Sequence, residues 1–244
     1  IVSMFSYNSP ATPALFAATA SKIFDMTDLD PDNMASSVVT GQTSGYYSYQ
    51  QITTAGGAYM YVVNGTDSAL LYDGSTFTAI TGVSTPAITG VTTSTLSFVW
   101  LFKNRLFFVQ KDTLVTWYLA TDSISGVAGD FSLAGVFQRG GSVLFGGTWS
   151  MDSGSGMDDK WVVVSTEGEV AVYAGTDPGD PNAWAIEGRY DIARPLGIRG
   201  FVQAGGDLAI ATVDGIVPLS QIVQKDPAAL SFSAVTRKIE PLWK

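Results

Sequence analysis

Three groups of closely spaced carboxylates are the residues of this 244-residue chain whose types and spacing fit a known chemistry. In the first group, Asp28, Asp30 and Asp32 alternate like the first ligands of a calcium loop. The sixth position is Asn33 where such a loop needs glycine, and the twelfth is Val39 where it needs glutamate. We therefore interpret the segment as a solvated loop and predict no bound metal.

The second group begins like a turn motif of sialidase-like propellers, the Asp-box, which reads Ser-x-Asp-x-Gly-x-Thr-Trp. Ser150, Asp152 and Gly154 match its first half, but Gly156 and Met157 stand where threonine and tryptophan should follow. That motif stabilises a fold and does not catalyse. The match supports a propeller and says little about glycoside hydrolysis.

The third group is Asp158 and Asp159, on the same loop as Asp152. Two carboxylates facing each other across a sugar can act as acid and base in glycoside hydrolysis. Sialidase-like enzymes also bind the substrate carboxylate with arginines, and a basic group with a tyrosine follows: Arg189, Tyr190, Arg194 and Arg199. The alternative is an exposed turn around Pro195 in which these arginines bind carbonyls or nearby acids.

Histidine and cysteine are both absent from the chain. Without them there is no Ser-His-Asp or Cys-His catalysis, no disulfide framework and no thiolate zinc site. The chain also lacks a convincing cleft of paired carboxylates. We therefore predict a protein that is not an enzyme and that carries no catalytic residue, no cofactor and no metal.

The charge is acidic and unevenly placed. Twenty-two Asp and Glu face 13 Lys and Arg, for a net charge of −9, which argues against tight wrapping around nucleic acid. From Ile23 to Phe102 there is no basic residue at all. A negative wall would repel phosphates and let DNA slide, and the candidate channel-facing acids are Asp25, Asp28, Asp30, Asp32, Asp67 and Asp73. The alternative is that these acids face outside solvent and aid solubility.

A tyrosine-rich run follows Gly45 and stands apart from the other aromatic residues, most of which fall in apolar strand patterns. Its tyrosines are Tyr46, Tyr47 and Tyr49. Tyrosine is enriched at protein interfaces, so the run predicts an exposed contact patch.

Five hairpin patterns recur at nearly even intervals, and they predict the architecture. Their turns centre near residues 21, 65, 111, 167 and 214, in steps of 44, 46, 56 and 47 residues. A period in the forties built from hairpins, with no helical signal between them, is typical of a β-propeller of four-stranded blades. We predict an all-β propeller of about five visible blades in one domain, residues 1–244, as a fragment of a longer chain.

The flanking strands are predicted in three repeats. Inner strands should be 98–102, 143–149 and 200–203, and outer strands 75–80, 131–137 and 184–192. The first repeat looks degraded after Thr27, residues 81–97 are a connection or an exposed strand pair, and 226–230 is the one candidate helix. No apolar run reaches the length of about 18 residues that a transmembrane helix needs.

The stretch from Phe102 to Ser220 resembles a family of bacteriophage virion proteins. The resemblance is carried by these segments: 103–109 (Lys-Asn-Arg-Leu-Phe-Phe-Val), 117–119 with 122–124, 140–141, 170–178, 194–197, 205–208 and 214–220. Such proteins are similar in plan to the tail nozzle of short-tailed phages, also called tail tubular protein B or DNA-stabilisation protein. The matching segments are structural parts of the fold, so no individual functional residue of the family can be assigned to this chain.

The resemblance implies a propeller-containing subunit of the virion, placed in a homo-oligomeric ring around the DNA channel of the tail. It would retain packaged DNA, let DNA pass without specific binding, and contact portal or adaptor proteins and tail fibres or spikes. The alternative from the carboxylate and arginine groups is a carbohydrate-binding or carbohydrate-cleaving propeller that recognises a receptor. A generic propeller interaction module remains a third hypothesis.

Overall fold

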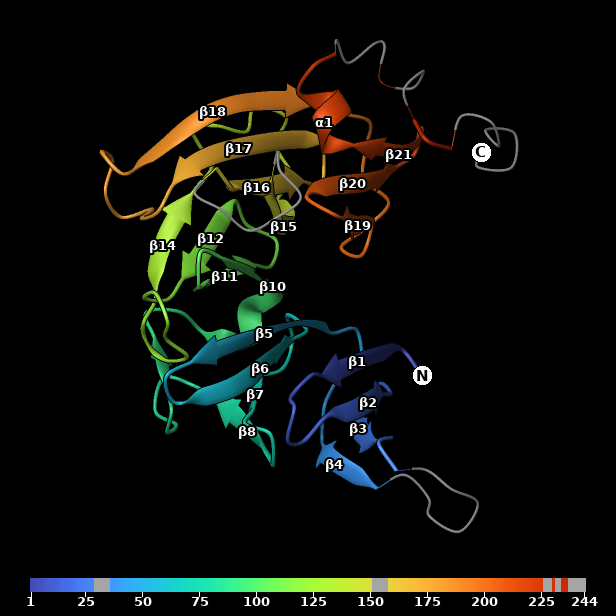
Figure 1. Cartoon of the computed structure of the whole chain (residues 1–244), viewed down its shortest axis with the longest axis vertical. Coiled ribbons are helices and arrows are strands. Elements are labelled where there is room, and N and C mark those ends of the chain that lie inside the picture. Colours follow the sequence, from blue (N-terminus) through green and yellow to red (C-terminus); the bar gives the residue numbers. More distant parts are fainter. Residues whose placement is uncertain (29–35, 151–157, 226–229, 231–233, 237–244) are drawn as a thin grey trace. The chain divides into compact units, whose positions relative to one another are not determined.

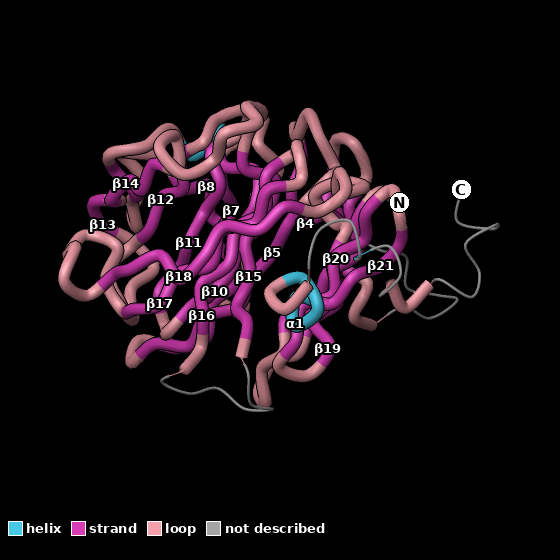
Figure 2. Tube along the Cα trace, turned by 90° about the horizontal axis from the view of Figure 1, so that it is seen from above, coloured by secondary structure: helices cyan, strands magenta, loops and turns pink. Residues whose placement is uncertain are grey.

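The computed structural model describes residues 1–28, 36–150, 158–225, 230 and 234–236. These residues are almost entirely strands and connecting turns, as the tube in Figure 2 shows. They form two compact units, one of residues 1–111 with 117–130 and one of residues 112–116 with 131–244. Among the described residues, no helix is both long enough and apolar enough to span a membrane.

The first unit contains two complete four-stranded antiparallel sheets, each with its strands in chain order. The first sheet is β1 (Ser3–Tyr7), β2 (Ala14–Ala18), β3 (Lys22–Asp25) and β4 (Ser37–Thr40). The second is β5 (Ser48–Thr54), β6 (Gly57–Val63), β7 (Ala69–Tyr72) and β8 (Phe77–Ile80). Each is an up-and-down sheet, the building block of a propeller blade (Figure 1).

A third sheet follows in the order β10, β11, β12 and β14. Its strands are β10 (Leu96–Phe102), β11 (Arg105–Gln110), β12 (Val115–Tyr118) and β14 (Gly129–Ser132). The connection from the second sheet holds the short strand β9 (Ile88–Thr89) and the 3-10 turn η1 (Thr93–Thr95). Strand β9 pairs in parallel with β13 (Gly126–Val127), so the stretch 81–97 is a connection that contains one very short strand.

The second unit carries the remaining two sheets. The fourth sheet is β15 (Val143–Trp149), β16 (Lys160–Ser165), β17 (Glu169–Gly175) and β18 (Trp184–Asp191), in that order. The fifth is β19 (Phe201–Ala204), β20 (Asp207–Thr212) and β21 (Gly215–Pro218), followed by the four-residue helix α1 (Leu219–Ile222). Beside β21, the backbone N–H of Val235 donates to the carbonyl of Ile216 at 2.9 Å.

Local turn chemistry explains why the hairpins form where they do. Lys103 and Asn104 join β10 to β11 with positive φ angles of 46° and 56°, the left-handed geometry that a two-residue hairpin turn requires. Gly168 has a φ of +81°, and a Cβ placed there would lie 2.4 Å from the carbonyl oxygen of Ile192. Only glycine fits that position without moving backbone atoms.

Within each unit, consecutive sheets pack face to face. In the first unit, one buried cluster that includes Phe16 and Met60 joins the first and second sheets. A second cluster that includes Tyr61 and Phe108 joins the second and third sheets. In the second unit, the ring of Phe145 on β15 stacks on that of Phe201 on β19, with centroids 4.7 Å apart.

The first strands of the second and third sheets lie beside each other, as inner strands of a propeller should. In the first unit β5 contacts β10, and the backbone N–H of Val99 donates to the Ser48 hydroxyl at 3.2 Å. The fold is all-β, a β-propeller, and the prediction from the hairpin period is confirmed. The prediction of a single domain stays a prediction.

Two expectations about the repeats are corrected. The first repeat is not degraded, because Ser37–Thr40 completes its sheet and Val39 packs against the cluster shared with the second sheet. The fifth sheet has three strands among the described residues, in the order β19, β20 and β21. Its hairpin β20–β21 is therefore not at the centre of a four-stranded sheet in the described residues. The other four hairpins are central, as predicted. Of the candidate helix, residues 226–229 lie outside the described residues.

Candidate functional site

Asp67 ties two connections of the first unit together. Its carboxylate accepts hydrogen bonds from the N–H and hydroxyl of Thr43, at 2.9 and 2.7 Å, and from the N–H of Ser44 at 3.3 Å. The side-chain amide of Asn64 donates to the same carboxylate at 2.7 Å. Burial alone would raise the pKa of Asp67, but these hydrogen bonds outweigh it and hold the pKa below its usual value. Asp67 therefore acts as a structural clasp between the connection that follows β4 and the β6–β7 turn.

Asp73 and Asp25 also serve turns. Asp73 accepts hydrogen bonds from the N–H groups of Ser75 and Thr76, at 2.8 and 2.7 Å. The backbone bond from Thr76 is the main cause that holds the pKa of Asp73 below its usual value. Asp25 accepts the N–H of Thr27 at 2.9 Å.

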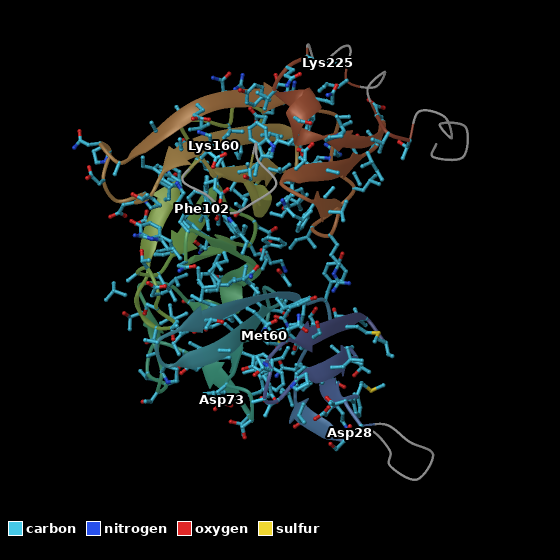
Figure 3. All side chains as sticks on the ribbon, in the orientation of Figure 1. Asp28, Met60, Asp73, Phe102, Lys160 and Lys225 are labelled. Carbon is cyan, nitrogen blue, oxygen red and sulfur yellow. The ribbon has the colours of Figure 1, made fainter. Side chains whose placement is uncertain are left out.

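The remaining members of the acidic set are placed only in part. Asp28 is exposed, and Figure 3 labels it together with Asp73 in the first unit. Asp30 and Asp32 lie outside the described residues. The hypothesis that these acids face a DNA channel stays a prediction, and for Asp25, Asp67 and Asp73 the structure adds a local role in turns.

The tyrosine run divides into two exposed side chains and a buried one. Tyr46 and Tyr49 are 43% and 42% exposed, but Tyr47 is 4% exposed and belongs to the core of the first unit. The Tyr47 hydroxyl donates to Oε1 of Gln42 at 2.9 Å. Burial, and secondarily the charge of Asp67, raise the pKa of Tyr47. The prediction of Tyr47 as part of an exposed contact patch is therefore wrong.

The carboxylates of the predicted loop are described only in part. Asp152 and the rest of the segment 151–157 lie outside the described residues. Asp158 is half-buried and Asp159 is 7% exposed, and both lie immediately before β16. The next residue, Lys160, binds Glu187 across the sheet, with its ammonium nitrogen 2.6 Å from the carboxylate (Lys160 is labelled in Figure 3). Within the described ranges, no group of three or more acidic side chains could hold a metal ion.

The arginines of the candidate sugar site are engaged with carboxylates at the β16–β17 end of the fourth sheet. The Arg189 guanidinium lies 2.5 Å from Oε1 of Glu169, and Arg194 lies 2.6 Å from the carboxylate of Glu167. Arg199 is exposed in the connection before β19. Arg189 and Arg194 therefore both have acidic partners on β17 or the β16–β17 turn, as the turn interpretation expected.

Glu169 is the centre of this group and the functional-looking residue that the sequence analysis missed. Its side chain is 0% exposed, and its carboxylate accepts the N–H groups of Gln138 and Arg139 at 2.8 and 2.9 Å, in addition to Arg189. Burial alone would raise the pKa of Glu169, but the hydrogen bonds and the charge of Arg189 hold it below its ordinary value of 4.5. The sequence signal that could have identified Glu169 is a single acidic residue at the start of the apolar strand β17.

Four aromatic rings of the second unit pack mutually: Phe131, Trp161, Tyr173 and Trp184. The rings of Tyr173 and Trp184 stack with centroids 5.6 Å apart, while Phe131 meets Trp161 edge-on at 5.7 Å. Trp161, Tyr173 and Trp184 are each at most 7% exposed. These aromatics are packing between strands, as expected, and leave no open platform for a sugar or a base.

Comparisons with known proteins support a class of fold. No family model matches the chain, and no curated protein matches it. Two crystal structures of BBS1N in complex with ARL6DN, soaked with mercury and with lead, match with TM-scores of 0.50 and 0.52. They are 14% and 13% identical over 89% of this chain, which spans 62% of the length of the matched chain.

A mutant of Aleuria aurantia lectin in complex with α-methyl-L-fucoside also matches, at 13% identity over 88% of this chain and 72% of the lectin. Its TM-score of 0.43 is too low to carry an argument about fold or ligand. At these identities the likeness to solved structures concerns the fold alone. The chain is a β-propeller protein.

Proposed function

We propose that this chain is a structural subunit of a tailed-phage virion, in a nozzle or tail-tip ring around the DNA channel. The observation that carries the proposal is the resemblance of the Phe102–Ser220 stretch to phage virion proteins. That stretch runs from the last residue of β10, in the third sheet, to helix α1, which follows the fifth sheet. In this proposal the chain retains and conducts DNA, contacts portal or adaptor proteins, and anchors fibres or spikes.

The residues that carry the resemblance lie at positions that determine architecture. Several lie where the backbone is left-handed, such as Asn104, Asp122, Gly205 and Gly215. Residues at such positions fix turns, because few other residues adopt positive φ without strain. The resemblance is therefore one of architecture, which suits a structural role in a ring and names no reactive group.

The pairing of Arg189 does not favour the carbohydrate alternative. A sugar-acid site needs a guanidinium that is open to the ligand, but Arg189 is paired with a fully buried Glu169. Breaking a buried pair to bind a ligand would leave an uncompensated charge, which costs about 3–5 kcal/mol. The net charge of −9 agrees instead with a surface past which DNA moves without sticking.

The test is whether the chain is part of the virion. Particles of the phage or induced prophage that encodes this chain are banded by density and analysed by mass spectrometry and by immunogold electron microscopy. We expect the chain at several copies per particle, with gold at the tail. Particles from a deletion of its gene should lose packaged DNA, and complementation should restore it. The chain's absence from banded particles, with its presence in the surrounding lysate, would refute the proposal.

A further inference from the structure

The chain contains one Asn-Gly dipeptide, Asn64-Gly65, in the turn between β6 and β7. Asparagine is chemically labile, and it is especially so before glycine, because glycine has no side chain to hinder attack by its own backbone nitrogen on the asparagine amide. Gly65 has a φ of +71°, a left-handed backbone that favours glycine. The turn geometry therefore keeps a reactive dipeptide in the chain.

The reaction at such a dipeptide is deamidation, which consumes water and needs no other reactant. The backbone nitrogen of Gly65 loses its proton to hydroxide and attacks Cγ of Asn64, forming a C–N bond and a cyclic succinimide. The bond from Cγ to Nδ2 breaks, and the amide nitrogen takes up protons from water and leaves as ammonia. Water then opens the ring at either carbonyl, which leaves aspartate or isoaspartate at position 64.

The folded first unit holds the attacking nitrogen in place. The Gly65 N–H donates to the carbonyl oxygen of Leu96 at 2.8 Å, and Gly65 is buried. A Cβ placed on Gly65 would lie 3.0 Å from Cβ of Ser97 and 3.1 Å from Cδ of Lys111, so these two side chains lie directly over it. Removal of the proton by hydroxide therefore requires local opening of the turn.

The side-chain amide of Asn64 is held as well. Its Nδ2 donates to the carbonyl oxygen of Ser44 at 2.8 Å and to the carboxylate of Asp67 at 2.7 Å. Its Oδ1 accepts the N–H groups of Thr66 and Asp67 at 3.0 and 2.8 Å. Asn64 is 9% exposed, so a rotation that carried Cγ onto the nitrogen of Gly65 would leave buried polar groups without partners.

We propose that Asn64 is a latent deamidation site, which the clasp around Asp67 keeps closed in the folded chain and which reacts when that clasp is released. The product adds a carboxylate at position 64, beside the carboxylate that now accepts the Asn64 amide. Two neighbouring carboxylates repel each other, so the modification would keep the clasp open. The inference does not depend on the proposed function, because every contact it uses lies within the first unit.

The experiment incubates the purified chain at mildly alkaline pH, in buffer and in concentrated urea, and follows Asn64 by peptide mapping with mass spectrometry. The wild-type chain should deamidate at Asn64 at least about tenfold more slowly in buffer than in urea, because the folded turn must first open. Asp67→Ala should speed the reaction in buffer by about tenfold or more, since it removes an acceptor of the Asn64 amide. Asp73→Ala is the matched control, because Asp73 serves another turn of the same unit and its loss should leave the rate unchanged.

Thr43→Val is a milder variant that leaves Asn64 and Asp67 in place. It removes the hydroxyl that donates to Asp67 at 2.7 Å and should raise the rate in buffer by about threefold or more. Circular dichroism on the same samples shows whether each variant is folded, and if Asp67→Ala does not fold, Thr43→Val alone decides. Equal rates of the wild-type chain in buffer and in urea, or rates in the folded clasp variants equal to that of Asp73→Ala, would overturn the proposal.

Discussion

Replacing Glu169 with glutamine should destabilise the second unit far more than an ordinary loss of one charge. The buried carboxylate accepts N–H groups from Gln138 and Arg139 and pairs with Arg189 at 2.5 Å. Glutamine keeps the shape but puts an NH₂ group where one acceptor oxygen was, and it leaves the guanidinium without its nearest counter-charge. Losing one partner of a buried ion pair costs about 3–5 kcal/mol.

The assay is urea unfolding at pH 7, followed by tryptophan fluorescence, because Trp161 and Trp184 are buried in the same sheet. With a denaturant slope of about 2 kcal/mol per molar urea, a loss of about 4 kcal/mol lowers the midpoint by about 2 M. The matched control is Glu187→Gln, which removes the more exposed pair with Lys160 and should cost about 0–1 kcal/mol.

The pH dependence gives a second readout of the same residue. Because the pKa of Glu169 is lower in the folded chain than its ordinary 4.5, ionised Glu169 contributes stability above pH 4.5. That contribution is lost as the pH falls through the lower, folded pKa. The stability difference between wild type and Glu169→Gln should therefore shrink on acidification below about pH 4.5. A Glu169→Gln chain as stable at pH 7 as the Glu187→Gln control would refute the reasoning.

Two further substitutions test the turns. Gly168→Ala should cost about 1–3 kcal/mol in thermal unfolding, because its Cβ would meet the carbonyl of Ile192 at 2.4 Å in a left-handed backbone, whereas Gly135→Ala, with nothing within 4 Å, should be nearly neutral. Equal effects of the two would contradict the steric argument. Asp67→Asn should cost about 1–2 kcal/mol at pH 7 and progressively less below about pH 3.8, since the carboxylate has a lowered pKa. An acid-independent loss would show that its charge does not stabilise the clasp.

The hairpins could be predicted because their determinants are local. Asn64 and Gly65 begin the β6–β7 turn, with Gly65 at a φ of +71°, and the alternation on either side needs no distant contact. The strand Ser37–Thr40 was missed because it is short and only Val39 packs into the shared cluster. This strand pairs with β3, from which it is separated in the sequence by the segment that contains Asp28.

The site residues could not be predicted to the same degree, because burial is a property of the packed sheets. Tyr46, Tyr47 and Tyr49 look alike in sequence, and it is the Ser3 hydroxyl of β1, accepting the Tyr47 N–H at 3.0 Å, that helps hold Tyr47 inward. Glu169 looks like an ordinary strand-end acid until Gln138, Arg139 and Arg189 are brought to it from two other segments.

The parallel pair of β9 and β13 has a consequence for the order of folding. Nearly every other strand pair joins neighbours in the chain, so each sheet can form from local contacts that close quickly. Ile88 pairs with Gly126 across the stretch of chain that contains β10, β11 and β12, so closing this pair costs more loop entropy than closing a hairpin. We therefore expect this pair to close late, joining the second and third sheets into one cooperative unit after each has already formed.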